Sequence, residues 1–131
     1  SEVWKTKDDL LRSIPGVGAV TSQTILAKCP ELGRLNRREI AKLTGVAPLA
    51  DDSGKHRGKR FIWGGRADVR AILYMAAISA IRCNPDIKIF ADRLKQAGKP
   101  AKVVIVACML KLLTIMNTML KNNAPWRAQN A

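Results

Sequence analysis

One serine, Ser53, lies in a stretch of the chain that carries many groups able to bind phosphate. Residues 50–70 read ADDSGKHRGKRFIWGGRADVR. A serine hydroxyl is a weak nucleophile near neutral pH, and it needs a base or nearby cations to attack a phosphodiester. The basic residues of this stretch are Lys55, His56, Arg57, Lys59, Arg60, Arg66 and Arg70. These residue types at this spacing permit transfer of a phosphodiester to serine.

The same stretch also fits an ordinary turn followed by a solvated basic face. Residues 51–54 are Asp, Asp, Ser and Gly, which favour turns. His56, the only histidine, suits a nucleic-acid contact or a solvated position better than a general acid. Arg66 and Arg70 are four residues apart at the start of an expected helix, so they share a face that could bind phosphate. From the residues alone, Ser53 is either a turn residue or a nucleophile.

The charge of the chain selects the class of partner. The 131 residues carry a formal charge of +13, and hydrophobic residues make up 47%. This length and composition predict one globular domain, residues 1–131. A small protein this basic is expected to bind nucleic acid, and an anionic membrane surface ranks below that. Because the chain begins with Ser1 and not methionine, we expect a fragment of a longer protein.

The three cysteines exclude two kinds of site. Cys29, Cys83 and Cys108 are an odd number without a CxxC pair, which argues against a disulfide framework and against zinc. We expect no metal site in this chain. Apolar neighbours predict buried cysteines in a reducing cytoplasm.

The elements that must position Ser53 are predicted to be helices only. We expect an all-α fold: a compact helical domain with helices near 4–13, 19–29 and 37–44, core helices over about 66–122, and one long glycine-rich basic loop, about 46–65. Asn36, Glu39 and Gly45 predict a capping box and a glycine stop around the third helix. Residues 103–120 are almost membrane-like, but Lys111 at their centre favours a buried core helix. Tyr74, the rival nucleophile, is expected in the core, and the tail after residue 122 is expected to fray.

A glycine turn near the N-terminus is a second candidate phosphate site. Residues 10–25, LLRSIPGVGAVTSQTI, resemble the helix-hairpin-helix motif of DNA-binding proteins, and the helix-hairpin-helix-like part covers about 7–29. Gly16 and Gly18 permit a tight turn, and the next helix begins at once with unpaired N–H groups. Such a helix start binds DNA phosphate without reading sequence. The alternative is an ordinary turn between packed helices.

Most of the chain resembles a known family. The segments LRSIPGVGAVTSQTIL, LTGVAPLADDSGKHRGKRFIWGGRADVRAILYMAAISAIRCNP and FADRLKQAGKPAKVVIVACMLKLLTIMNTMLK are similar to the C-terminal domain of the insertion-sequence transposases of the one-ten/one-sixteen type. This group includes Piv-like DNA invertases. The resemblance implies that Ser53 is the nucleophile of DNA cleavage and exchange. It also implies an upstream RuvC-like acidic domain that holds Mg²⁺, DNA as substrate, a guide RNA in some members, and a homo-oligomer with a composite active site.

Two other functions stay open at this point. The chain could be a non-catalytic DNA- or RNA-binding module that clamps the phosphate backbone through the hairpin and the basic loop. It could also be a basic RNA-associated protein of ribosomal type, although its concentrated apolar core suits docking on partners better. Without the acidic domain, the chain by itself is expected to bind nucleic acid and not to recombine it.

Overall fold

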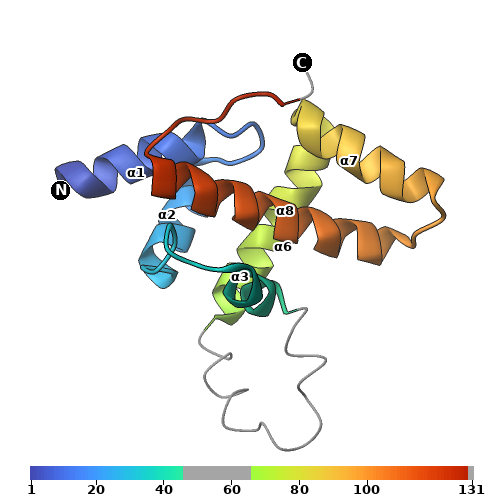
Figure 1. Ribbon diagram of the computed structural model, residues 1–131, viewed down its shortest axis with the longest axis horizontal. Coiled ribbons are helices and arrows are strands. Elements are labelled where there is room, and N and C mark those ends of the chain that lie inside the picture. The colour runs from blue at the N-terminus through green and yellow to red at the C-terminus, as the bar shows by residue number, and fades with distance from the viewer. Residues whose placement is uncertain (46–65, 130–131) are drawn as a thin grey trace, which may run out of the picture.

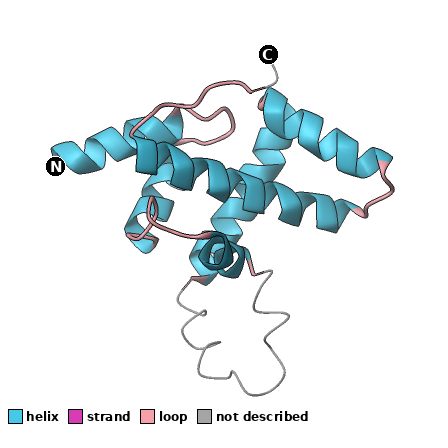
Figure 2. Ribbon diagram, viewed as in Figure 1, coloured by secondary structure: helices cyan, strands magenta, loops and turns pink. Residues whose placement is uncertain are grey.

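The fold is that of a computed structural model, and it describes residues 1–45 and 66–129. The described residues form six α-helices and no strand, which confirms the all-α prediction (Figure 1, Figure 2). The helices are α1 (Glu2–Arg12), α2 (Ala19–Lys28), α3 (Arg37–Thr44), α6 (Ala67–Cys83), α7 (Pro85–Gln96) and α8 (Ala101–Asn122).

The two longest helices, α6 and α8, form the centre of the domain. Figure 1 shows α8 crossing α6, with α1 and α7 toward one side of the crossing and α3 toward the other. Leu73 and Ala77 of α6 and Leu112 and Met116 of α8 are fully buried. Although α8 is long and apolar enough to cross a membrane, it packs against α1, α3, α6 and α7. The prediction of a core helix over this segment is therefore confirmed.

Local signals in the sequence set the bounds of α3. The Asn36 side chain accepts a hydrogen bond from the Glu39 N–H, and the Glu39 carboxylate accepts one from the Asn36 N–H, both at 2.9 Å. Gly45 ends the helix with φ of +87°, a left-handed conformation that glycine adopts without strain. Both the capping box and the glycine stop were predicted, and both are confirmed.

The turn between α1 and α2 packs tightly on the C-terminal end of α6. Gly16 has φ of +103°, and a Cβ added to it would lie 2.7 Å from the Ala80 Cα. The buried Asn84 donates from Nδ2 to the Pro15 carbonyl at 3.1 Å, and its Oδ1 caps α7 by accepting from the Asp86 and Ile87 N–H groups. The turn is thus fixed to the junction of α6 and α7. Whether it belongs to the helix-hairpin-helix class stays a prediction.

Two expectations about burial and one about the C-terminal tail were wrong. Tyr74 is 39% exposed, because α2, α7 and α8 cover other faces of α6. Cys83 is exposed at the end of α6, whereas Cys29 and Cys108 are buried as expected. The tail does not fray directly after α8: the Trp126 N–H donates to the Ser13 hydroxyl at 2.9 Å, and the Gln129 N–H donates to Asp86 at 2.8 Å.

Candidate nucleic-acid interface

The predicted site residues divide into two groups. Ser53 and the basic residues that follow it lie outside the described residues, so their predicted roles stay predictions; these are Lys55, His56, Arg57, Lys59 and Arg60. The structure places the four remaining candidates: Gly16, Gly18, Arg66 and Arg70. Arg66 and Arg70 lie next to the attachment points of the segment 46–65, whereas Gly16 and Gly18 lie in the turn before α2.

Both attachment points of this segment lie at one end of the domain. Gly45 ends α3, and Arg66 directly precedes α6. A Cβ on Gly45 would lie 3.3 Å from the Arg70 Cδ, so the first turn of α6 contacts the end of α3. The segment that carries Ser53 therefore leaves and rejoins the helical body at neighbouring places.

Arg66 is held by a carboxylate of the protein itself. Its Nη2 pairs with Glu31 Oε2, and its Nη1 lies 3.9 Å from the Cys29 Sγ. Burial raises the pKa of the Glu31 carboxyl, but the hydrogen bond and charge of Arg66, with a backbone hydrogen bond, outweigh it and lower that pKa from its usual 4.5. Burial and the charge of Glu31 raise the pKa of the Cys29 thiol to about 11. In this arrangement Arg66 joins the loop after α2 to the start of α6.

The Glu31–Arg66 pair leads to a prediction about stability and pH. We expect Arg66→Gln to lower the free energy of unfolding by about 1 kcal/mol at pH 7, because the pair is partly exposed and the variant leaves a half-buried carboxylate without its partner. Since the pKa of Glu31 is lowered in the folded state, its stabilisation is present above about pH 4.5 and is lost as the pH falls through the folded-state pKa. Urea unfolding at pH 7 and pH 3.5 measures the difference.

Arg70→Gln is the matched control for this prediction. It removes an arginine from the same helix, and Arg70 has no ion pair recorded among residues 1–45 and 66–129. The control should lose less free energy of unfolding at pH 7, and its loss should be the same at pH 3.5 as at pH 7. Equal, pH-independent losses in both variants would show that Arg66 does not act through Glu31.

The glycine hairpin lies at the opposite end of α6. Gly16 contacts Ala80, whereas Gly45 contacts Arg70, and these two positions on α6 are about 15 Å apart along the helix axis. Gly18 is exposed, and nothing lies within 4 Å of a Cβ added to it. No side chain caps α2 and its first turn carries no acidic residue, so its N–H groups are open to an anion. The glycine hairpin and the attachment points of the segment 46–65 are therefore separate in space.

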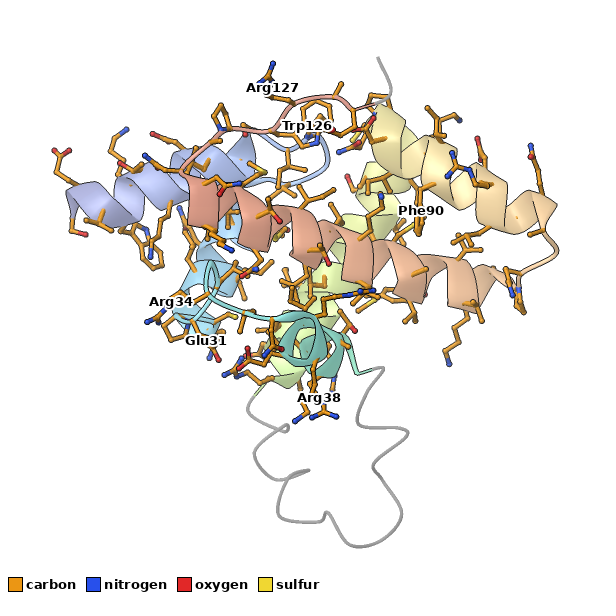
Figure 3. All side chains as sticks on the ribbon, viewed as in Figure 1. Glu31, Arg34, Arg38, Phe90, Trp126 and Arg127 are labelled. Carbon is orange, nitrogen blue, oxygen red and sulfur yellow. The ribbon has the colours of Figure 1, made fainter. Side chains whose placement is uncertain are left out.

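Sequence reasoning missed a group of arginines at the start of α3 and in the turn before it. Arg34, Arg37 and Arg38 are exposed, and within the described part of the chain none of them pairs with a carboxylate. Figure 3 shows Arg34 beside Glu31 and Arg38 extending from α3 away from α8. The signal available in the sequence was the clustering of these three arginines within five residues of a chain with a formal charge of +13.

The helical body itself offers no evident metal site. Over residues 1–45 and 66–129, no group of three or more His, Cys, Asp or Glu side chains is placed to hold a metal ion. Burial raises the pKa of the Cys108 thiol to about 11, as it does for Cys29, so both buried cysteines are protonated near neutral pH. The exposed arginines and lysines and the uncapped start of α2 are groups that bind phosphate.

Comparison with known proteins gives the context of this surface. The family described as "Transposase IS116/IS110/IS902 family" matches residues 8–92. The pilin gene-inverting protein of Moraxella bovis is 31% identical over 121 residues, which cover 89% of this chain and 38% of that protein, and the Moraxella lacunata protein of the same name gives the same figures. The insertion element IS900 uncharacterized 42 kDa protein of Mycobacterium paratuberculosis is 28% identical over 88% of this chain.

The extent of these matches defines what they establish. The chain spans 38% of the length of the pilin gene-inverting proteins and 30% of the IS900 protein. No solved structure shows a significant match. The family match covers well over half of the chain, including Ser53, its basic neighbours, both glycines of the hairpin and Arg66 and Arg70. The chain therefore belongs to the IS116/IS110/IS902 family of transposases.

Proposed function

We propose that this chain is the part of a DNA transposase or site-specific recombinase that supplies the serine nucleophile, Ser53. The observation that carries the proposal is the family match over residues 8–92, because it includes Ser53 together with the basic residues around it. Relatives named as pilin gene-inverting proteins support DNA rearrangement as the reaction of the intact protein. DNA is then the substrate, and the reaction takes place in the bacterial cytoplasm.

The proposed step is a transesterification at phosphorus. The Ser53 Oγ loses its proton and forms a bond to the phosphorus of a DNA phosphodiester. The bond from phosphorus to one deoxyribose oxygen breaks, and that oxygen leaves with a proton. Negative charge grows on the non-bridging oxygens, and arginine forks stabilise it well because they donate two parallel hydrogen bonds. The candidate donors are Lys55, Arg57, Lys59 and Arg60.

The geometry around the attachment points supports this assignment. Gly45 and Arg66 are fixed by α3, by the Glu31 ion pair and by contact with Arg70, so the segment between them starts and ends on rigid structure. Rigid supports favour precise placement of reacting groups. Arg37 and Arg38 add exposed positive charge beside α3. DNA held against this end of the domain would meet both the arginines and the Ser53 segment.

The intact protein is proposed to contain the other half of the active site. An upstream acidic domain would hold Mg²⁺, which would neutralise charge on the reacting phosphate. We also propose a homo-oligomer, and an element-encoded guide RNA as a further partner. Each of these proposals concerns the intact protein. The pilin gene-inverting relatives, which are longer than this chain, support the proposal of a longer intact protein.

Mapping a covalent protein–DNA product tests the proposal. The intact protein is incubated with its DNA junction and Mg²⁺, the reaction is quenched with denaturant, and the modified peptide is located by mass spectrometry. A phosphodiester on Ser53 is the expected result. Recombination without any adduct, or an adduct on another residue, would instead leave the segment as a clamp that binds the phosphate backbone.

A further inference from the structure

A basic pocket lies where α1, the turn after α2 and the end of α8 meet. The pocket has a volume of about 550 Å³. Its charged lining residues are Lys7 of α1, Arg34 of the turn and Lys121 of α8, and no carboxylate lines it. We propose that this pocket binds backbone phosphates of the nucleic acid on which the protein acts, at a place separate from the attachment points of the segment 46–65. The inference rests on the proposed function only in taking nucleic acid as the partner.

The charges of the pocket are free to act on a ligand. Within the described residues, none of the three cations forms an ion pair, whereas Lys5, Arg12, Lys28 and Arg66 each pair with a carboxylate. Arg34 and Lys121 are exposed, and Lys7 is half-buried. Three positive groups from three distant parts of the chain would repel one another, and an anion between them relieves that repulsion. Phosphate suits both arginine forks and lysine point charges.

The turn that presents Arg34 is rigidly built. The buried Asn117 of α8 accepts from the Gly33 N–H at 2.7 Å and from the Leu35 N–H at 3.1 Å, and it donates to the Leu35 carbonyl at 3.0 Å. Gly33 has φ of +104°, and a Cβ on it would lie 3.3 Å from the Leu120 Cβ. The backbone on both sides of Arg34 is therefore locked onto α8, next to Lys121. A preorganised cation loses less entropy on binding than a flexible one.

The rest of the pocket suits a polynucleotide better than a lone anion. Leu32, Leu35 and Leu120 form an apolar wall beside the cations, which fits the sugar that follows each phosphate. Arg37 and Arg38 continue the positive surface from Arg34 to α3, and α3 is about 12 Å long. A nucleic-acid strand lying along this path would reach from the pocket to the attachment points of the Ser53 segment. The pocket would thus hold the strand beyond the reacting phosphate.

A charge-matched pair of variants tests the pocket. The intact protein carries Ser53→Ala in all samples, so that binding is measured without chemistry. The pocket variant is Lys7→Gln, Arg34→Gln and Lys121→Gln; the control variant is Lys95→Gln, Lys99→Gln and Lys102→Gln, three exposed lysines at the α7–α8 turn. The probes are a mixed-sequence DNA duplex and an RNA hairpin. Affinity is measured by fluorescence anisotropy over a range of salt concentrations.

The pocket variant is expected to bind one or both probes about tenfold to a hundredfold more weakly than the control variant. Its slope of log affinity against log salt should fall by about 2.7 on the DNA duplex if all three phosphate contacts are lost. The control variant removes the same net charge from a surface that is not expected to contact phosphate. Its slope should therefore barely change. The probe that loses affinity identifies which nucleic acid occupies the pocket.

Equal effects of the two triple variants, or an unchanged slope in the pocket variant, would overturn the proposal. If the triple variant unfolds at a lower temperature than the control variant, the single variant Arg34→Gln is used for the test instead. Arg34→Lys is then expected to recover part of the binding. The result is independent of the proposed nucleophile, because binding is scored without Ser53. An adduct on Ser53 with no change of salt slope would support the proposed nucleophile and contradict the proposed pocket. A change of salt slope without an adduct would support the pocket and contradict the nucleophile.

Discussion

Ser53→Ala in the intact protein is expected to abolish the covalent protein–DNA product and to lower strand cleavage by about 10⁴-fold or more, because no other group takes over a missing nucleophile. Binding of DNA should change little, since the variant loses only the hydroxyl group and no positive charge. Cleavage of a labelled junction under single-turnover conditions measures the rate, and gel separation after denaturation measures the adduct.

The serine control is Ser79→Ala, in the partly buried middle of α6. It should cleave DNA at nearly the original rate. Arg57→Gln with Arg60→Gln is the complementary variant: it should weaken binding and reduce the salt slope, and saturating DNA should restore only part of the cleavage rate. Recombination that survives Ser53→Ala would assign the chemistry to another residue and leave the basic stretch as a clamp.

Gly16→Ala is expected to destabilise the domain by about 3 kcal/mol. Two effects add: φ of +103° is strained for any residue with a Cβ, and the new Cβ would lie 2.7 Å from the Ala80 Cα, where backbone must move. The loss should appear as a lower urea midpoint and a lower melting temperature. Because the turn is tied to Asn84 through Pro15, the junction of α6 and α7 should loosen with it.

Gly18→Ala is the matched control, two residues further along the same turn. Gly18 has φ of −101°, and a Cβ there would meet no atom within 4 Å. Its cost should stay below about 1 kcal/mol, the ordinary difference between residues at a helix N-cap. Similar losses for the two glycines would mean that the contact of Gly16 with Ala80 is not what stabilises the hairpin.

Features encoded over a few residues were predictable from the sequence. The bounds of α3 follow from Asn36, Glu39 and Gly45, all within one short segment. Pro85, a residue type that favours the first turn of a helix, is the first residue of α7. The buried character of α8 followed from its apolar composition and from Lys111 at its centre. In each case the residues that decide the structure are sequence neighbours, so no knowledge of packing was needed.

Features that depend on partners far away in the chain were not predictable. The pairing of Arg66 with Glu31, 35 residues earlier, could not be read from the sequence, and the predicted phosphate contact of Arg66 stays a prediction. Tyr74 lies in an apolar helix, and composition alone does not show which face of such a helix its neighbours leave uncovered. The backbone N–H of Trp126 donates to the hydroxyl of Ser13, 113 residues away. The basic pocket likewise joins three elements that only the fold brings together.

The position of α6 has a mechanical consequence. Its C-terminal end is held by Gly16 and Asn84, and its N-terminal end borders the segment that carries Ser53. The helix is about 25 Å long, so it acts as a lever arm: a tilt of about 10° at the hairpin would displace the other end by about 4 Å. Reacting groups must be placed to within about 0.5 Å. Changes at the hairpin should therefore alter the cleavage rate from a distance.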